Sequence, residues 1–533
     1  MTDTNQANDN PHVAQSGFLA GSNVFMSVAS AIMVVAFVAF TISDVEFAGS
    51  VFSSTKNFIM SSLDWFYVLV VSAVLIFVIW LPFSRFGHLK LGKDDDTPDF
   101  STFSWISMLF SAGMGSGLLY WGVAEPLYHV QGNPFDEIAG VEPNTVQAAI
   151  TAVRITVFHW GLHGWALYVL VGLSLAYFAY RNDLPLTLRT ALYPILKDKI
   201  YGFWGHAVDL VGVFGTVFGL ATSLGMGVVA INAGMETLIG FTNSTGNQLI
   251  LIGVITILGT TSAVSGVDKG VRILSEMNVI ASIALMLIFL IFGPTAFILG
   301  IMMSSMGDYV ATAIPMGFWI DGRPDSDWQS WWTVFYWGWW VAWCPFVGLF
   351  IARISRGRTI REFTACVLLI PTVVLVLWLS VFGGGSIGME LFRDAGLIDA
   401  VNADYAVGIF KAIEALGLGW ATFPLTVLTT VLLVSWFVTS SDSGTLVVST
   451  MLSMGNENPP INLRLFWGLG SGAVAAVLLL AGGLEALQTA SIVAGLPLAV
   501  IVLLMACGTL KAMREEHPLP DYEDRMNMIF LNR

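Results

Sequence analysis

Long apolar segments separated by short polar loops recur along this chain of 533 residues. About 20 consecutive apolar residues cross the hydrocarbon core of a bilayer as a helix, and twelve segments meet that length. The predicted spans are residues 23–43, 62–83, 102–128, 147–180, 206–236, 248–266, 275–303, 329–354, 363–386, 423–452, 464–482 and 487–508. The pattern therefore predicts an all-α polytopic membrane protein with 12 transmembrane helices.

Two of the predicted spans contain residues that interrupt helices. The third span includes three glycines within 113–117, and the eighth includes Gly338 and Pro345. Glycine and proline have the lowest helix propensities. Interruptions at matching places in spans 3–7 and 8–12 predict a 5+5 inverted repeat, an architecture of transporters whose site lies at the breaks. The glycine string also resembles a nucleotide-binding loop, but that loop follows a strand in a soluble βαβ unit.

Composition supports the membrane class. The chain is 56% hydrophobic and 11% charged, with a mean hydropathy of +0.75, whereas a soluble domain carries roughly 25% charged residues. The net charge of −14 argues against a nucleic-acid partner. Most Lys and Arg residues follow even-numbered spans or lie in the C-tail, which predicts that both termini are cytoplasmic. No paired carboxylates, metal-ligand spacing or nucleophile with a base is present, which argues against an enzyme or a receptor and predicts no cofactor.

The domain organisation follows from these spans. We expect a disordered cytoplasmic N-tail (1–22), a membrane domain (23–508) and a short cytoplasmic C-tail (509–533). Within the membrane domain, the first repeat covers about 102–303 and the second about 329–508.

Six of the 19 tryptophans of the chain lie within residues 331–350. Tryptophan in membrane helices normally collects at the two interfaces with water, yet here several tryptophans fall near the middle of a span. Two interpretations stay open for this segment. One is plain aromatic packing between helices, and the other is a site whose ring faces bind a quaternary cation.

Four long motifs resemble the betaine/choline/carnitine transporter family. They are GMGSGLLYWGVAEPLYH (113–129), HWGLHGWALY (159–168), WGWWVAWCPFVGLFIARISRGRTIREF (337–363) and FVTSSDSG (437–444). The resemblance extends over roughly residues 60–508. It implies a LeuT-like ten-helix core behind two extra helices, a homotrimer in the bacterial inner membrane, and uptake of small trimethylammonium or dimethylsulfonium solutes.

The resemblance also implies roles for individual residues. The substrate site would contain Trp160, Trp165, Tyr168, Trp339, Trp340, Trp343, Met114 and Ser116. The gates along the substrate path would be Phe335 and Phe346. The sodium site would contain Ser111, Met114, Trp436, Thr439 and Ser440. Without the resemblance, hydrogen bonds from Thr439 and Ser440 to their own helix would be the simpler reading.

The substrate class follows from what surrounds the predicted box. No Lys or Arg is expected next to the predicted box, so a substrate carboxylate would be met by backbone and indole N–H groups. Choline-type members resemble one another in an aspartate where this chain has Gly117. A zwitterion such as glycine betaine or dimethylsulfoniopropionate is therefore favoured, and a choline transporter or a sodium-independent carnitine-type exchanger is the alternative.

Coupling to sodium is expected because span 5 lacks the basic residue that sodium-independent exchangers of the family carry. A second ion site near Thr222 and Ser223 is a further hypothesis, and two sodium ions per zwitterion would suffice for strong accumulation. His159 and His163 would be structural polar groups or, less simply, proton carriers. The arginines of 353–361 would contact anionic membrane lipids.

Overall fold

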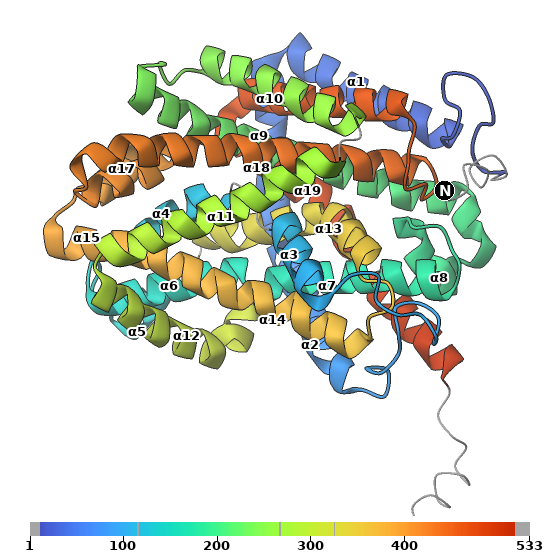
Figure 1. Cartoon of the computed structure of the whole chain (residues 1–533), viewed down its shortest axis with the longest axis horizontal. Coiled ribbons are helices and arrows are strands. Elements are labelled where there is room, and N and C mark those ends of the chain that lie inside the picture. The colour runs from blue at the N-terminus through green and yellow to red at the C-terminus, as the bar shows by residue number, and fades with distance from the viewer. Residues whose placement is uncertain (1–10, 114–116, 266–267, 324–325, 518–533) are drawn as a thin grey trace, which may run out of the picture.

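The computed structural model describes residues 11–113, 117–265, 268–323 and 326–517 as a bundle of helices (Figure 1). Within these residues, eleven helical segments are long and apolar enough to cross a membrane. Strand-like pairing among them is limited to one isolated bridge between Lys90 and Thr359. The prediction of an all-α polytopic membrane protein is confirmed, while the number of twelve crossings and the inverted repeat stay predictions.

The first half of the chain forms the helices that carry Trp160, Trp165 and Tyr168 of the predicted site. They are α1 (Val24–Ser43), α2 (Val45–Trp80), η2 (Leu81–Phe83), α3 (Thr102–Gly113), α4 (Gly117–Val130), α5 (Pro134–Ala139), α6 (Val146–Trp160), α7 (Leu162–Ala176), η3 (Tyr177–Arg181), η4 (Leu188–Leu192), α8 (Tyr193–Leu196), η5 (Lys197–Tyr201), α9 (Phe203–Ile239), α10 (Thr245–Ser265), α11 (Asp268–Phe292) and α12 (Thr295–Gly317). The side chains of Asn23, Asp44 and Thr145 accept hydrogen bonds from first-turn amides and so fix the starts of α1, α2 and α6.

The second half begins with the tryptophan-rich helix. Its elements are η6 (Ser330–Val334), α13 (Phe335–Ile354), α14 (Ile360–Leu379), η7 (Ser380–Gly384), α15 (Gly385–Arg393), α16 (Leu397–Ala403), η8 (Tyr405–Val407), α17 (Gly408–Ala415), η9 (Gly419–Ala421), α18 (Thr422–Leu452) and α19 (Ile461–Glu516). The last of these contains both predicted spans 11 and 12, and its backbone is non-helical at Gly482 and Gly483.

Two predicted spans differ from the helices observed. Span 7 was expected to run without a break over 275–303, but α11 ends at Phe292 and α12 begins at Thr295. The cause is Gly293–Pro294, because proline has no N–H to continue a helix and clashes with the preceding turn. Span 4 is also two helices, since Gly161 between α6 and α7 has a non-helical backbone conformation.

The predicted interruption of span 8 is wrong. Helix α13 continues through Gly338 and Pro345, as membrane helices tolerate such residues when neighbours compensate for the lost bond. Gly338 serves close packing instead, because a Cβ there would lie 2.9 Å from the Cα of Ile492 in α19. In span 3, α3 ends at Gly113 and α4 begins at Gly117; residues 114–116 lie outside the described ones.

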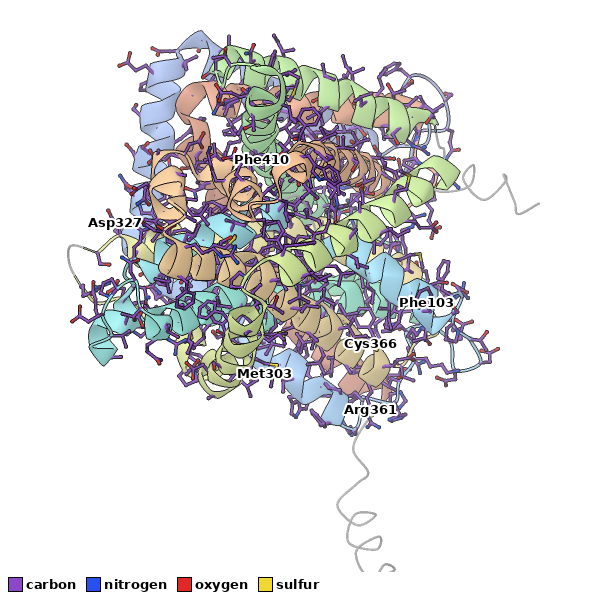
Figure 2. The ribbon with its side chains drawn as sticks, turned by 60° about the vertical axis from the view of Figure 1, so that its left-hand side comes forward. Phe103, Met303, Asp327, Arg361, Cys366 and Phe410 are labelled. Atoms are coloured by element: carbon purple, nitrogen blue, oxygen red, sulfur yellow. The ribbon has the colours of Figure 1, made fainter. Side chains whose placement is uncertain are left out.

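Helix α13 lies in the middle of the bundle and packs against α3, α7, α9 and α19 (Figure 1). In Figure 2, Asp327 just before η6 and Arg361 at the start of α14 lie at different margins of the molecule. The helix between these two positions carries its tryptophans in the interior, where their exposed fractions are 0% to 8%. Nearly all of its side chains are buried.

The segment before α1 also makes defined contacts. From residue 11 it was expected to belong to a disordered tail, yet the His12 ring stacks on Tyr201 at 4.5 Å between centroids. The Asn23 side chain donates to the backbone oxygen of His12, and Asn462 donates to that of Phe18. These contacts hold the described part of the segment against η5 and α19.

Candidate functional site

Five aromatic side chains from three helices meet beside α13. Trp160 ends α6, Trp165 and Tyr168 lie on α7, and Trp339 and Trp340 lie on α13. Their exposed fractions range from 0% to 8%, so the group is closed off from solvent in this conformation. We call these five residues the aromatic box.

Trp340 is the centre of the box. Its ring centroid lies 4.9 Å from that of Tyr168, 6.1 Å from that of Trp160 and 6.3 Å from that of Trp165. Trp160 meets Trp339 at 5.8 Å with an interplanar angle of 81°. The ring planes are therefore steeply inclined to one another. Faces of some rings and edges of others border the same space between the helices. Such an arrangement can surround a cation with the negative faces of several rings.

Glycines make room for these rings. A Cβ on Gly164 would lie 2.4 Å from the ring of Trp340, so α7 can approach this tryptophan only with glycine at that position. A Cβ on Gly117, at the start of α4, would lie 2.8 Å from Trp339 and 3.2 Å from Trp160. The position at which choline-type relatives were expected to carry aspartate therefore borders the box directly.

The indole N–H groups of the box and of the neighbouring Trp343 fall into two sets. Trp340 donates to the backbone oxygen of His159 at 2.9 Å, and Trp339 donates to Ser223 Oγ at 3.2 Å. In contrast, the buried Nε1 atoms of Trp165 and Trp343 have no hydrogen-bond partner among the described residues. A buried N–H without a partner costs free energy. These two donors are therefore suited to an anionic group of a bound solute.

A buried carboxylate supports the remaining box tryptophan. Glu125 of α4 accepts from Trp160 Nε1 at 2.9 Å and from the Tyr336 hydroxyl at 2.5 Å, both on Oε2. His159 Nδ1 lies 2.6 Å from its Oε1, and His129 Nε2 lies 3.5 Å from the same oxygen. Neither Glu125 nor Tyr336 was predicted to be a partner of the box. Their separation along the chain gives no signal, because the contact forms only when α4, α6 and α13 pack together.

The same cluster could in principle hold a metal ion. Glu125, His129 and His159 are buried, and each offers a ligand atom within 4.8 Å of the others. The oxygens of Glu125 already accept from an indole and a phenol, and one of them lies 2.6 Å from an imidazole nitrogen. We therefore interpret the cluster as a hydrogen-bond network.

Comparison with known proteins agrees with this geometry. Residues 24–518 match the model of the betaine/carnitine/choline family transporters. The chain belongs to this family. It is 40% identical over 93% of its length to a probable glycine betaine transporter of Desulfitobacterium hafniense, of which the match covers 98%. It is 41% identical over 88% of its length to a glycine betaine transporter of Bacillus subtilis, of which 90% is covered.

A third relative widens the range of solutes among similar proteins. A glycine betaine/proline/choline/ectoine transporter of Vibrio parahaemolyticus is 38% identical over 97% of this chain and 91% of its own length. Membership of the family makes the chain a multi-pass membrane transporter and not an enzyme.

The two residues predicted as gates of the transporter lie at either end of the tryptophan cluster. Phe335 stacks on Trp339 with centroids 5.6 Å apart and planes at 15°. Phe346 meets Trp343 at 5.2 Å and 63°. Eleven residues of α-helix span roughly 16 Å, so the two predicted gates lie well apart along α13, with Trp339, Trp340 and Trp343 between them.

The residues predicted to bind sodium are only partly described. Met114 and Ser116 lie outside the described residues, and for Ser111 only the backbone is described. On α18, the Thr439 hydroxyl donates to the backbone oxygens of Trp436 at 2.8 Å and of Ser435 at 3.1 Å. Ser440 follows on the same helix and is half-buried. The sodium site therefore stays a prediction.

Near the predicted second ion site, both hydroxyls have protein partners. Thr222 Oγ1 donates to the backbone oxygens of Phe218 and Leu487 at 2.8 and 2.7 Å and accepts from Ser491. Ser223 Oγ donates to the backbone oxygen of Gly219 at 3.1 Å. These contacts join α9 to α19 beside the box. Any ion here would have to replace or share them.

The box is separate from a cavity of about 340 Å³ between α1, α2, α9 and α19. The lining of this cavity is mostly apolar and includes Phe37, Phe52, Phe214 and Phe218. None of the box residues belongs to it. An apolar lining of this kind suits a hydrocarbon group and not a zwitterion. The box is therefore the better indication of the transported solute.

Proposed function

We propose that this transporter takes up a small zwitterionic onium solute by sodium symport with alternating access. The aromatic box carries the proposal, because ring faces bind a methylated onium group at roughly 0.5–2 kcal/mol per good contact. A small, strongly hydrated cation would have to lose its water to bind the same rings. The unpartnered N–H groups of Trp165 and Trp343 supply donors for the carboxylate of a zwitterion.

Glycine betaine and dimethylsulfoniopropionate are the proposed substrates. The names of two similar transporters support the first, and Gly117 supports a zwitterion over choline, since no aspartate stands against the box. A choline transporter and a sodium-independent carnitine-type exchanger are the alternatives. The wider substrate range in the name of the Vibrio relative makes the first alternative worth testing directly.

Sodium coupling is supported by residue type. The segment 214–229 of α9 contains no Lys or Arg, and Thr439 and Ser440 supply hydroxyl oxygens of the kind that sodium prefers. We further propose a homotrimer in the bacterial inner membrane, with cytoplasmic termini and lipid contacts at the arginines of 353–361. The excess of Lys and Arg in one set of loops supports this orientation.

The expected stoichiometry follows from the free energy of accumulation. Concentrating a neutral solute about 10⁴-fold costs roughly 5.5 kcal/mol. One sodium ion supplies about 2.3 kcal/mol from a potential of 100 mV and about 1.4 kcal/mol from a tenfold gradient. One ion is too little and two are enough. Two sodium ions per zwitterion would carry two net charges, and a measured value of one would contradict this stoichiometry.

The test is uptake of labelled glycine betaine into proteoliposomes, with and without an inward sodium gradient. Dimethylsulfoniopropionate, choline and carnitine serve as competitors. Sodium-dependent accumulation would support symport, and the order of competition would identify the preferred solute. Counterflow that does not depend on sodium would establish an exchanger instead, and absence of uptake for all four solutes would contradict the proposed substrate class.

A matched pair of variants links uptake to the box. Trp340→Ala removes the central ring, whereas Trp420→Ala removes a tryptophan of η9 that is 87% exposed and lies outside the box. The proposal expects loss of uptake in the first variant and wild-type uptake in the second.

A further inference from the structure

A fully buried carboxylate whose ion-pair partners are histidines needs a reason in a membrane protein. Glu125 has an exposed fraction of 0%, and among the described residues its ion-pair partners are only His129 and His159. Neither Lys nor Arg is among these partners. Ionisable residues at such positions are costly and usually serve function.

The hydrogen bonds of Glu125 lead to two rings of the box. One oxygen accepts directly from the indole N–H of Trp160. The other lies 2.6 Å from His159 Nδ1, and the backbone oxygen of His159 accepts from the indole N–H of Trp340. His159 is itself held on its far side, where Nε2 lies 3.0 Å from the Thr333 hydroxyl. The carboxylate thus fixes Trp160 and, through His159, the central ring.

The charge of the carboxylate should also act through the indole of Trp160. A hydrogen-bonded group polarises its partner, and this effect is strong where the dielectric constant is low. An anion at the N–H edge of an indole increases the negative potential on the ring face, which is the source of its attraction for cations. The hydrogen bond to Glu125 is the one bond from a described box ring to an acidic side chain. The bond from Trp160 is therefore the route by which an ionised Glu125 would place negative charge on the box.

We propose that Glu125 is a specificity-determining positioning residue of the aromatic box. It holds the rings of Trp160 and Trp340 in place, and its charge makes the box prefer an onium head to an uncharged group of the same shape. This inference rests on the proposed function, because it takes the onium solute as given and adds what selects it.

The variant Glu125→Gln separates charge from geometry. Both Trp160 Nε1 and the Tyr336 hydroxyl donate to the same oxygen, Oε2. A glutamine oxygen at this place keeps both bonds, and its NH₂ group can donate to His159 Nδ1 in the alternative tautomer. The His159 Nε2–H would then face the Thr333 hydroxyl, which can accept. The hydrogen-bond network survives this substitution while its charge is lost.

The ligands for the test differ in charge alone at the head group. Glycine betaine carries a trimethylammonium head, and 3,3-dimethylbutanoate carries a tert-butyl group of nearly the same shape on the same acetate tail. Their apparent affinities are measured by competition against labelled glycine betaine binding to the purified full-length protein. For wild type, the proposal expects glycine betaine to bind more tightly than its carbon isostere.

For Glu125→Gln, we expect glycine betaine to bind roughly 3- to 30-fold more weakly, the range of one cation–π contact. The carbon isostere should bind as it does to wild type, so the ratio of the two affinities falls. A purely structural role would weaken both ligands equally and leave the ratio unchanged, which would overturn the proposal. Glu516→Gln is the control, because Glu516 also accepts from a tyrosine, Tyr177, but at the end of α19, outside the box. It should leave the ratio unchanged.

A second variant keeps the test decisive if Glu125→Gln does not fold. Trp160→Phe retains an aromatic face but has no N–H to bond with Glu125, so it should reduce the same ratio. A wild-type ratio in Trp160→Phe would overturn the proposal. Failure of the proposed function has a different result, since wild-type protein would then not bind glycine betaine at all.

Discussion

The aromatic box and the hydroxyl-bearing segment of α18 were both predicted to bind a cation, yet they are built in different ways. In the box, rings from three helices converge, and the relevant groups are side chains whose chemistry is plain from residue type. In α18, the Thr439 hydroxyl bonds to its own helix, and the predicted backbone ligands lie partly outside the described residues. An organic cation can be recognised by what the side chains are. A sodium site depends on where backbone oxygens point.

The largest effect should come from Trp340→Ala, which removes the ring that contacts three others in the box. The loss of one well-placed cation–π contact predicts roughly a 3- to 30-fold increase in the KM for glycine betaine. Packing against Gly164 would be lost as well. The measurement is initial uptake over a range of substrate concentrations. Trp340→Phe retains a ring face and should lie between wild type and alanine; equal uptake in all three proteins would show that the box does not bind the solute.

Gly117→Asp tests the other side of the box and should act almost as strongly. The new Cβ would approach Trp339 and Trp160 closely, and the carboxylate would repel that of a zwitterion. We expect about tenfold weaker uptake of glycine betaine, together with new uptake of choline, which has no carboxylate. Gly246→Asp is the control, because a Cβ there has nothing within 4 Å. Unchanged preference between the two solutes would mean that residue 117 does not face the substrate.

Thr439→Ala addresses the segment of α18. If the hydroxyl is a sodium ligand, its loss costs about 1 kcal/mol and raises the sodium concentration for half-maximal uptake roughly fivefold. If it serves only its own helix, sodium dependence stays as in wild type. Thr237→Ala in α9 removes another hydroxyl that donates to its own helix, and it should change neither sodium nor substrate dependence.

These residues show which parts of the fold and of the site can be predicted from the sequence. Hydropathy and composition predict the all-helical membrane class, and motif resemblance predicts Trp160, Trp165, Tyr168 and Trp340, which the structure brings together. The break at Gly161 was missed, although two glycines in HWGLHG offered a signal. A break of α13 at Gly338 was wrongly predicted, because low helix propensity does not distinguish a break from close packing, here against Ile492. Glu125 was missed as a partner of Trp160 because spacing along a chain does not encode contacts between helices.

The smallest effect should come from Asp321→Asn, in the loop before η6 and outside both predicted binding regions. Hydrogen bonds from Arg323 hold the pKa of Asp321 down to about 2, and Arg323 also pairs with Glu137. A lowered pKa stabilises the folded loop above the ordinary aspartate pKa of about 3.9, and this stabilisation is lost as the pH falls through about 2. The group therefore adds no pH dependence between pH 5 and 8. Because the Arg323 side of the pair is exposed and the loop lies outside both predicted binding regions, Asp321→Asn should change the KM less than about twofold at pH 5 and at pH 8. A change as large as that of Trp340→Ala would mean that substrate affinity responds to the loop as strongly as to the box.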